Sequence, residues 1–254
     1  MASEGPKNRK TLHDYFGSAE QLSALKRPFT ANGQVGSARV PPGLSLFPDF
    51  ITAKEETSLL QFLDAQSWRT DLSRRTMHYG GTYCLMPPRN ASPAVRKQYE
   101  QNIITAPAIP LELNFLIDRM VAEGLYTINE RPEYCIVNEY LPGQGISAHV
   151  ENFRFGEPVC SLTLAGGDSM RFHELSAAHD GSVRSGKAAT APRTGLRKDV
   201  WLASRSLVVL RGDARSKWQH EIVRGRKTGK ADCWRRVSLT FRVMKSKEDR
   251  EKAP

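Results

Sequence analysis

The chain has 254 residues, of which 39% are hydrophobic and 25% charged, a composition typical of a soluble globular protein with one core and room for tails. No stretch approaches the ~20 apolar residues of a membrane span, and the N-terminus lacks the apolar segment of a secretory signal. We therefore expect a monomer without membrane attachment, in the nucleus and/or the cytoplasm. The cysteines form no paired motif and are typical of reduced thiols: Cys84, Cys135, Cys160 and Cys233.

The formal net charge of +10 is unevenly distributed. The segment from Arg184 to Lys245 holds 17 Lys and Arg against 4 Asp and Glu. A basic region of this kind predicts contact with phosphates or other anions, which makes DNA or RNA the expected partner. A solvated basic surface is the alternative, because charge patterning alone does not separate the two.

Residues 1–40 are polar and lack a sustained hydrophobic period, so we expect a mostly disordered basic tail. Its segment RKTLHDYF places Leu12, Tyr15 and Phe16 at the spacing typical of boxes that bind sliding clamps, although Arg9 replaces the usual Gln. Apolar anchors in a disordered segment fit binding of a helix in a groove, so a sliding clamp is a candidate partner. A short helix that packs on the folded domain is the alternative.

Two helices are predicted in the first half of the folded domain. The segment 52–66 has Thr52 as a plausible N-cap and Glu55 at the capping-box spacing, followed by apolar residues on one face. The segment 110–125 repeats the helical period and ends at Gly124, a typical residue just beyond a helix.

The rest of the domain, expected over 41–246 with a C-terminal tail at 247–254, favours strands. Residues 74–85 predict a strand, a Gly-Gly turn and a second strand, and many short alternating segments follow residue 130. We expect an α+β, mainly β fold, with a sandwich, jelly roll or barrel on which the two helices pack. The interruption at 175–198 predicts a surface insertion, whose basic residues either extend a phosphate track or are solvated: Lys187, Arg193, Arg197 and Lys198.

The segment VNEYLPGQGISAHVEN carries a histidine and a carboxylate two residues apart, directly after a Pro-Gly turn. In a strand, His149 and Glu151 point to the same side, and His220 in WQHEI is the best third ligand. Two histidines and one carboxylate form the facial triad of non-haem Fe(II) oxygenases. The alternative is a half-buried strand with two polar residues, since six histidines allow several accidental combinations.

The segment RRVSLTFR predicts a strand with a polar face. The residues at its successive i+2 positions are Arg236, Ser238, Thr240 and Arg242. Buried arginines require anionic partners, and a dicarboxylate supplies them because guanidinium binds carboxylate through two hydrogen bonds. Asn138 and Tyr140 also share a strand face. A basic edge strand with solvent-facing arginines is the alternative.

Together, NEYLPGQGISAHVE, WQHEI and RRVSLTFR, in that order, resemble the AlkB family of Fe(II)- and 2-oxoglutarate-dependent dioxygenases. The resemblance covers Glu133 to about Lys245 and extends more loosely to RRTMHYGGTY, which is similar to the nucleotide-recognition lid of that family. Two positions depart from the family pattern. Glu151 stands where Asp is usual, and Ser238 stands where Asn is usual.

The resemblance implies a double-stranded β-helix (jelly-roll) core at about 130–246 that uses Fe(II), 2-oxoglutarate and O2. It places His149, Glu151 and His220 on the iron. It also places Arg242 near the C1 carboxylate of 2-oxoglutarate and Arg236 at the distal carboxylate. The residues that would assist Arg236 are Asn138, Tyr140 and Ser238.

The implied reaction is oxidative removal of N-alkyl groups from nucleic-acid bases. In the lid, cations for phosphate and aromatic rings for stacking on an extruded base are the candidate substrate residues: Arg74, Arg75, His78, Tyr79 and Tyr83. An aromatic residue on a strand is more often part of the core, which is the alternative for Tyr79. Hydroxylation of a tRNA base or a protein side chain, and a non-catalytic nucleic-acid-binding homologue, are the competing functions.

Overall fold

The computed structural model describes residues 40–88, 90–152, 154–176, 191–225 and 233–245. The candidate clamp-binding residues of the N-terminal tail, Lys187 of the insertion and the C-terminal tail lie outside these residues.

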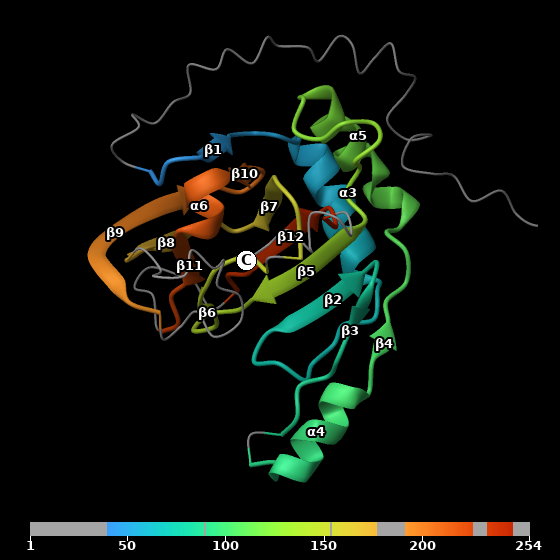
Figure 1. The fold of residues 1–254 in the computed structure, drawn as a ribbon. Coiled ribbons are helices and arrows are strands. Elements are labelled where there is room, and N and C mark those ends of the chain that lie inside the picture. Colours follow the sequence, from blue (N-terminus) through green and yellow to red (C-terminus); the bar gives the residue numbers. More distant parts are fainter. Residues whose placement is uncertain (1–39, 89, 153, 177–190, 226–232, 246–254) are drawn as a thin grey trace, which may run out of the picture.

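Two antiparallel sheets form most of the described structure (Figure 1). The larger sheet has the strand order β1-β10-β7-β12-β5-β2. Its strands are β1 (Leu44–Phe47), β10 (Leu207–Leu210), β7 (Val159–Ala165), β12 (Arg236–Arg242), β5 (Tyr134–Tyr140) and β2 (Arg75–Tyr79). The smaller sheet has the order β6-β11-β8-β9. Its strands are β6 (Ile146–His149), β11 (Trp218–Ile222), β8 (Asp168–Leu175) and β9 (Arg193–Leu202).

The described residues form more helices than the two that the sequence predicts. The described helices are α3 (Ala53–Asp64), α4 (Pro93–Gln101), the 3₁₀ turn η1 (Leu111–Leu113) with α5 (Asn114–Ala122), and α6 (Gly212–Ser216). The predicted capping box is present, because the Thr52 side chain accepts a hydrogen bond from the Glu55 backbone and the Glu55 carboxylate accepts one from the Thr52 backbone. Helices α4 and α6 were not predicted from the sequence. No residue of α4 is buried, and α4 projects away from the two sheets (Figure 1).

The larger sheet has two chemically different faces, because its central strands alternate apolar and polar residues. Val137 and Leu239 pair in register and belong to the hydrophobic core that includes side chains of α3 and α5. Asn138 and Ser238, the next registered pair, point to the opposite face. The helices therefore cover the apolar face and leave the polar face of β5 and β12 for the space between the sheets.

The two sheets face each other across a second apolar cluster. Phe172 and Ile222 of the smaller sheet are buried with Val159 and Val208 of the larger sheet in this cluster. Because this contact closes only part of the space between the sheets, polar side chains of β5, β6, β11 and β12 line a pocket there.

The predicted strand, Gly-Gly turn and strand at 74–85 form, but the two strands belong to different sheets. β2 pairs with β5, whereas β3 (Thr82–Tyr83) pairs with β4 (Ile104–Thr105). Gly80 and Gly81 have φ angles of 73° and 62°. A Cβ atom at Gly80 would lie 1.8 Å from the Glu133 carbonyl oxygen, so the chain requires glycine at this point.

Within the described ranges, no helix has the length and apolar character needed to cross a membrane.

Candidate active site

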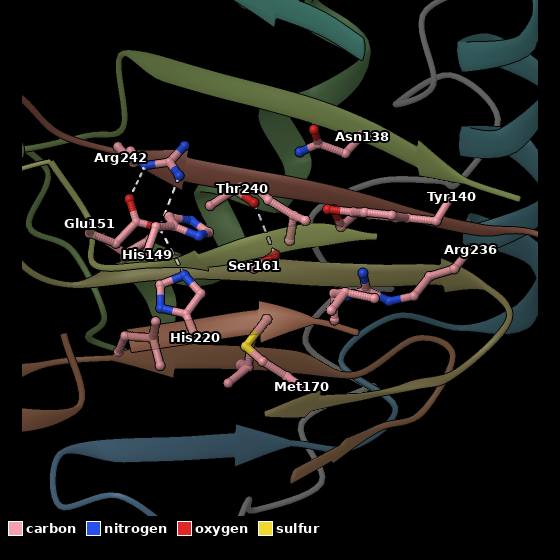
Figure 2. A pocket seen from close by; sticks show the side chains of 16 residues that line it. Asn138, Tyr140, His149, Glu151, Ser161, Met170, His220, Arg236, Thr240 and Arg242 are labelled. Atoms are coloured by element: carbon pink, nitrogen blue, oxygen red, sulfur yellow. Dashed lines mark hydrogen bonds and ion pairs between the residues drawn. The ribbon is translucent and has the colours of Figure 1, made fainter. Parts of the chain in front are cut away.

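The pocket between the sheets has two polar ends (Figure 2). His149, Glu151 and His220 lie at one end, and Tyr140 and Arg236 lie at the other. Residues between them, including Ser161, Met170 and Thr240, complete the lining.

Strand pairing brings the two predicted histidine ligands together. His220 of β11 lies directly opposite His149 of β6, and their ring centroids are 4.4 Å apart. One ligand atom from each of His149, Glu151 and His220 lies within 4.8 Å of the other two, and no other group of this kind is present among the described residues. Two imidazoles and one carboxylate on one side of a pocket suit Fe(II) with open positions opposite. The donor set therefore fits the metal that the sequence predicts.

His149 is in the form that can bind a metal. Its Nδ1 lies 2.8 Å from the Ser147 carbonyl oxygen, which can only accept, so Nδ1 carries the proton and donates. Burial, together with the nearby His220, lowers the pKa of His149 to about 4. The imidazole is therefore neutral at pH 7, with the lone pair of Nε2 available for coordination.

Glu151 is held as a carboxylate between Arg242 and His220. Arg242 donates from Nε and Nη2 to the two Glu151 oxygens, at 2.8 and 3.0 Å. His220 Nε2 lies 3.6 Å from Glu151 Oε1. Burial by itself raises the pKa of Glu151, but the charge and hydrogen bonds of Arg242, together with the nearby His220, hold it well below its ordinary value. The longer side chain thus brings a charged carboxylate to both histidines.

The other end of the pocket holds a buried cation. Arg236 is 1% exposed, and its Nη2 donates to Thr163 Oγ1 at 2.9 Å. Its guanidinium lies 5.4 Å from the Tyr140 ring, and burial lowers the pKa of Arg236. A buried guanidinium with no hydrogen-bonded carboxylate carries a large desolvation cost unless a ligand supplies an anion.

Unused hydrogen-bond donors at both ends of the pocket fit a dicarboxylate. Arg236 Nε and Arg242 Nη1 are buried and have no partner in the described structure. Both arginines line the same pocket, near its opposite ends (Figure 2). One molecule with a carboxylate at each end would use both donors.

Serine and threonine side chains contribute three hydroxyl groups to the pocket lining, those of Ser161, Ser238 and Thr240. Ser161 Oγ and Thr240 Oγ1 form a hydrogen bond of 3.0 Å. Ser161 and Thr163 were not among the predicted site residues, because nothing in the sequence of strand β7 distinguishes their hydroxyl groups from those of other buried residues. Ser238 lines the pocket as predicted and is 4% exposed.

A sequence profile of the 2OG-Fe(II) oxygenase superfamily matches residues 43–242. The human alpha-ketoglutarate-dependent dioxygenase alkB homolog 4 is 32% identical over 227 residues, which cover 80% of this chain and 67% of that protein. The chain belongs to the AlkB family of 2OG-Fe(II) oxygenases. It is a 2-oxoglutarate-dependent dioxygenase whose cofactors are Fe(II) and 2-oxoglutarate, with O2 as oxidant.

Other AlkB relatives are longer than the matched region. The Arabidopsis thaliana alkylated DNA repair protein ALKBH8 homolog is 31% identical over 217 residues, which cover 81% of this chain and 59% of that protein. The Mus musculus tRNA (carboxymethyluridine(34)-5-O)-methyltransferase ALKBH8 is 25% identical over 201 residues, covering 74% of this chain and 25% of that protein. This AlkB-family chain thus spans about three fifths of the length of the Arabidopsis protein and about one quarter of the length of the mouse protein.

The solved structure of OsALKBH1 shares the fold. It superposes with a TM-score of 0.50 at 19% sequence identity and covers 80% of this chain and 99% of that one. The antiparallel sheets are those of the jelly-roll fold of 2OG oxygenases.

The predicted substrate residues, which lie in and next to strands β2 and β3, divide between two faces of the sheet. Arg75 forms an ion pair of 2.6 Å with Glu139, and its guanidinium lies 4.8 Å from the Trp68 ring. Tyr79 is 6% exposed and belongs to the core beneath the helices. Both side chains lie on the sheet face opposite the pocket, and neither of them lines it.

Arg74, His78 and Tyr83 lie together on the pocket side. Arg74 Nε donates to Asn138 Oδ1 at 2.8 Å, and the His78 and Tyr83 ring centroids are 4.8 Å apart. Arg69, which is not among the predicted site residues, places its guanidinium 4.1 Å from the centroid of the Tyr83 ring. Its backbone bridge to Thr76 brings it to this position, a contact that no local pattern predicts.

The basic residues of β9 are mostly engaged by the protein itself. Arg193 Nε donates to Gln219 Oε1 at 2.8 Å, and Lys198 Nζ donates to the Val40 carbonyl oxygen at 2.8 Å. Arg197 is exposed. Of the three, Arg197 is therefore the one best placed for an external phosphate.

We expect the free energy of unfolding to fall as the pH is lowered from about 6.5 to about 4, because burial, together with Arg69 and Arg242, lowers the pKa of His78 to about 4. The unfolded chain takes up this proton near pH 6.5, whereas the folded chain takes it up only near pH 4, so protons favour unfolding within this window. The contribution of one group reaches about 1.4 kcal/mol per pH unit. Urea unfolding of His78→Gln at several pH values should show a flatter dependence than the unsubstituted protein. If the free energy of unfolding depends on pH equally in both proteins, His78 does not have the lowered pKa.

Proposed function

We propose that the protein hydroxylates an alkyl carbon carried by a nucleic-acid base, and that for an N-alkyl group this releases the alkyl carbon as an aldehyde. The observation that carries the proposal is the pocket, which has a His-Glu-His triad near a buried Arg242 and a second buried arginine, Arg236, at its other end. The substrate class rests on the Arg69–Tyr83–His78 group on the pocket side of β2 and on the relatives' names.

One group of pocket residues would bind the metal, and a second group would bind 2-oxoglutarate. His149, Glu151 and His220 would hold Fe(II), which with 2-oxoglutarate and O2 supplies the oxidation of a C–H bond. Arg242 holds Glu151 in place and would offer its unused Nη1 donor to the C1 carboxylate of 2-oxoglutarate. Arg236 would pair with the distal carboxylate.

Three further side chains would complete the distal carboxylate site. Tyr140 and Asn138 pair in register with Arg236 and Ser238 of β12, so all of them share one face of the sheet. The site is buried and hydroxyl-rich, which strengthens charge-assisted hydrogen bonds and excludes water from the reacting region.

The aromatic group near the pocket would bind the base. His78 pairs with Ile136, which pairs with Thr240 of the pocket lining, so the His78 ring lies on the same sheet face as the pocket. Tyr83 is held between contacts with His78 and Arg69 and offers an aromatic ring for stacking. Arg69 adds a cation for the phosphate backbone, although its ion pair with Asp71 at 2.8 Å reduces that charge.

A second candidate is hydroxylation of a modified uridine in tRNA, in which the hydroxyl group remains on the product. The substrate of this candidate is supported by the match to the mouse tRNA (carboxymethyluridine(34)-5-O)-methyltransferase ALKBH8, whose name gives a carboxymethylated uridine in tRNA. The same pocket serves either reaction, because both begin with hydroxylation of a carbon next to the base.

Mass spectrometry of products separates these functions. Purified protein would be incubated with Fe(II), ascorbate and 2-oxoglutarate, together with N-alkylated DNA, N-alkylated RNA or tRNA carrying a carboxymethylated uridine. Loss of the alkyl group supports N-dealkylation, and gain of one oxygen in tRNA supports the second candidate. Succinate formation without any change in nucleic acid would contradict the substrate class. Absence of succinate under all conditions would favour a non-catalytic binding protein.

A further inference from the structure

Arg74 connects the substrate side of the domain to the proposed cosubstrate site. Its Nε donates a hydrogen bond of 2.8 Å to Asn138 Oδ1, although the two residues are 64 positions apart in the sequence. Its guanidinium also lies 5.9 Å from the centroid of the Tyr140 ring. Asn138 and Tyr140 both line the pocket. Arg74 thus contacts two of the three residues that would assist Arg236.

The hydrogen bond determines which way the Asn138 amide faces. A guanidinium has only donors, so the atom that accepts from Arg74 must be the amide oxygen. The amide nitrogen then remains as the donor that Asn138 offers to a ligand in the pocket. Without Arg74, the amide can rotate and present its oxygen instead, which repels a carboxylate.

A second contact fixes the backbone next to Arg74. Gln144 Nε2 donates to the Ser73 carbonyl oxygen at 2.6 Å, and Gln144 Oε1 accepts from the Leu141 backbone at 2.9 Å. Gln144 belongs to the turn LPGQG, which precedes the strand that carries His149. The turn therefore holds Ser73 in place, and Arg74 reaches Asn138 from a defined position.

We propose that Arg74 is a positioning residue for 2-oxoglutarate, acting through Asn138 rather than by contacting substrate. The proposal rests on the function proposed above and deepens it. It reassigns one member of the predicted substrate set, because the described contacts of its guanidinium are with Asn138 and the ring of Tyr140. Arg74 stabilises the amide orientation that donates to the distal carboxylate, and its positive charge adds to the attraction for that carboxylate.

Direct binding of 2-oxoglutarate tests the proposal. Calorimetric titration of the full chain loaded with Mn(II), which replaces Fe(II) without turnover, gives the dissociation constant. We expect Arg74→Ala to weaken binding about tenfold, the effect of losing one charge-assisted hydrogen bond. Arg74→Lys keeps a cationic donor and should recover most of this loss. In steady state, the KM for 2-oxoglutarate should rise while the KM for nucleic acid changes little.

A double-mutant cycle with Asn138→Ala shows whether Arg74 acts through Asn138. The effect of Arg74→Ala should largely disappear when Asn138 is already alanine, because interacting residues are not additive. Arg75→Ala is the matched control, since Arg75 points to the opposite face and pairs with Glu139. It should lower thermal stability without changing the dissociation constant of 2-oxoglutarate at a temperature where the variant is folded.

The outcomes separate this inference from the proposed function. Unchanged 2-oxoglutarate binding in Arg74→Ala, or a rise confined to the KM for nucleic acid, would overturn the role of Arg74. Failure of the unsubstituted protein to bind 2-oxoglutarate would instead overturn the proposed function. If Arg74→Ala does not fold, Arg74→Met, which keeps the length of the side chain but has no hydrogen-bond donor, is measured with and without Asn138→Ala, and an additive effect would contradict the coupling.

Discussion

The variant His220→Ala is expected to lose iron-dependent formation of succinate by at least about 100-fold, more than the 10–100-fold typical of residues that only support a metal ligand. His220 lies opposite His149 and is 5% exposed, so no other described side chain can take its place in the triad. The variant should also lose binding of Mn(II) measured by calorimetry, which is independent of turnover. Retained metal binding together with retained turnover would remove His220 from the site.

Glu221→Gln is the matched control for this experiment. Glu221 follows His220 directly, but its side chain leaves the opposite face of β11, and its Oε1 lies 2.8 Å from His173 Nε2. The substitution changes a carboxylate next to the site without changing the pocket. Succinate formation should therefore stay close to that of the unsubstituted protein. An equal loss in both variants would indicate damage to strand β11 rather than loss of a ligand.

Arg236→Met is expected to weaken binding of 2-oxoglutarate by about 30-fold or more. Removing one partner of a buried charge pair costs about 2–5 kcal/mol, and each 1.4 kcal/mol corresponds to a factor of ten. In the absence of ligand, the variant should be at least as stable as the unsubstituted protein, because methionine avoids the cost of burying a guanidinium that has no hydrogen-bonded carboxylate. The rise in Tm that 2-oxoglutarate produces should disappear in the variant.

Arg235→Met provides the control for Arg236→Met. Arg235 is the preceding residue and forms an ion pair of 2.8 Å with Asp64 on the helix side of the sheet. Its substitution should leave the dissociation constant of 2-oxoglutarate unchanged. Thermal unfolding with and without 2-oxoglutarate measures both properties in one experiment. A ligand-induced rise in Tm that persists in Arg236→Met would contradict the distal carboxylate assignment.

Much of the site followed from spacing along the chain. The two-residue separation of His149 and Glu151, and the alternation of Arg236 and Arg242 with apolar neighbours, place these side chains on shared strand faces. The capping box at Thr52 and Glu55 is equally local, because both hydrogen bonds span three residues. Predictions of this kind hold because periodicity determines which side chains share a face.

The residues on the proposed substrate side were harder to predict, because strand periodicity groups side chains by face but does not say which face points to the pocket. The alternation of β2 separates Arg75 and Tyr79 from Arg74 and His78, but it does not say which group faces the pocket. Pairing of β2 with β5 and the packing of α3 and α5 decide this, since Tyr79 is buried with those helices. Arg69 reaches Tyr83 only through the backbone bridge to Thr76.

The sequence by itself predicted the candidate metal ligands, the polar face of β12 and the family resemblance, because each depends on short patterns in the chain. The tertiary structure alone decided that Arg242 holds Glu151, that Arg74 reaches Asn138 and that Arg75 supports the opposite face. These contacts join residues 64 or more positions apart. Such contacts depend on strand order and register, which the packing of whole sheets and helices determines and which no local period encodes.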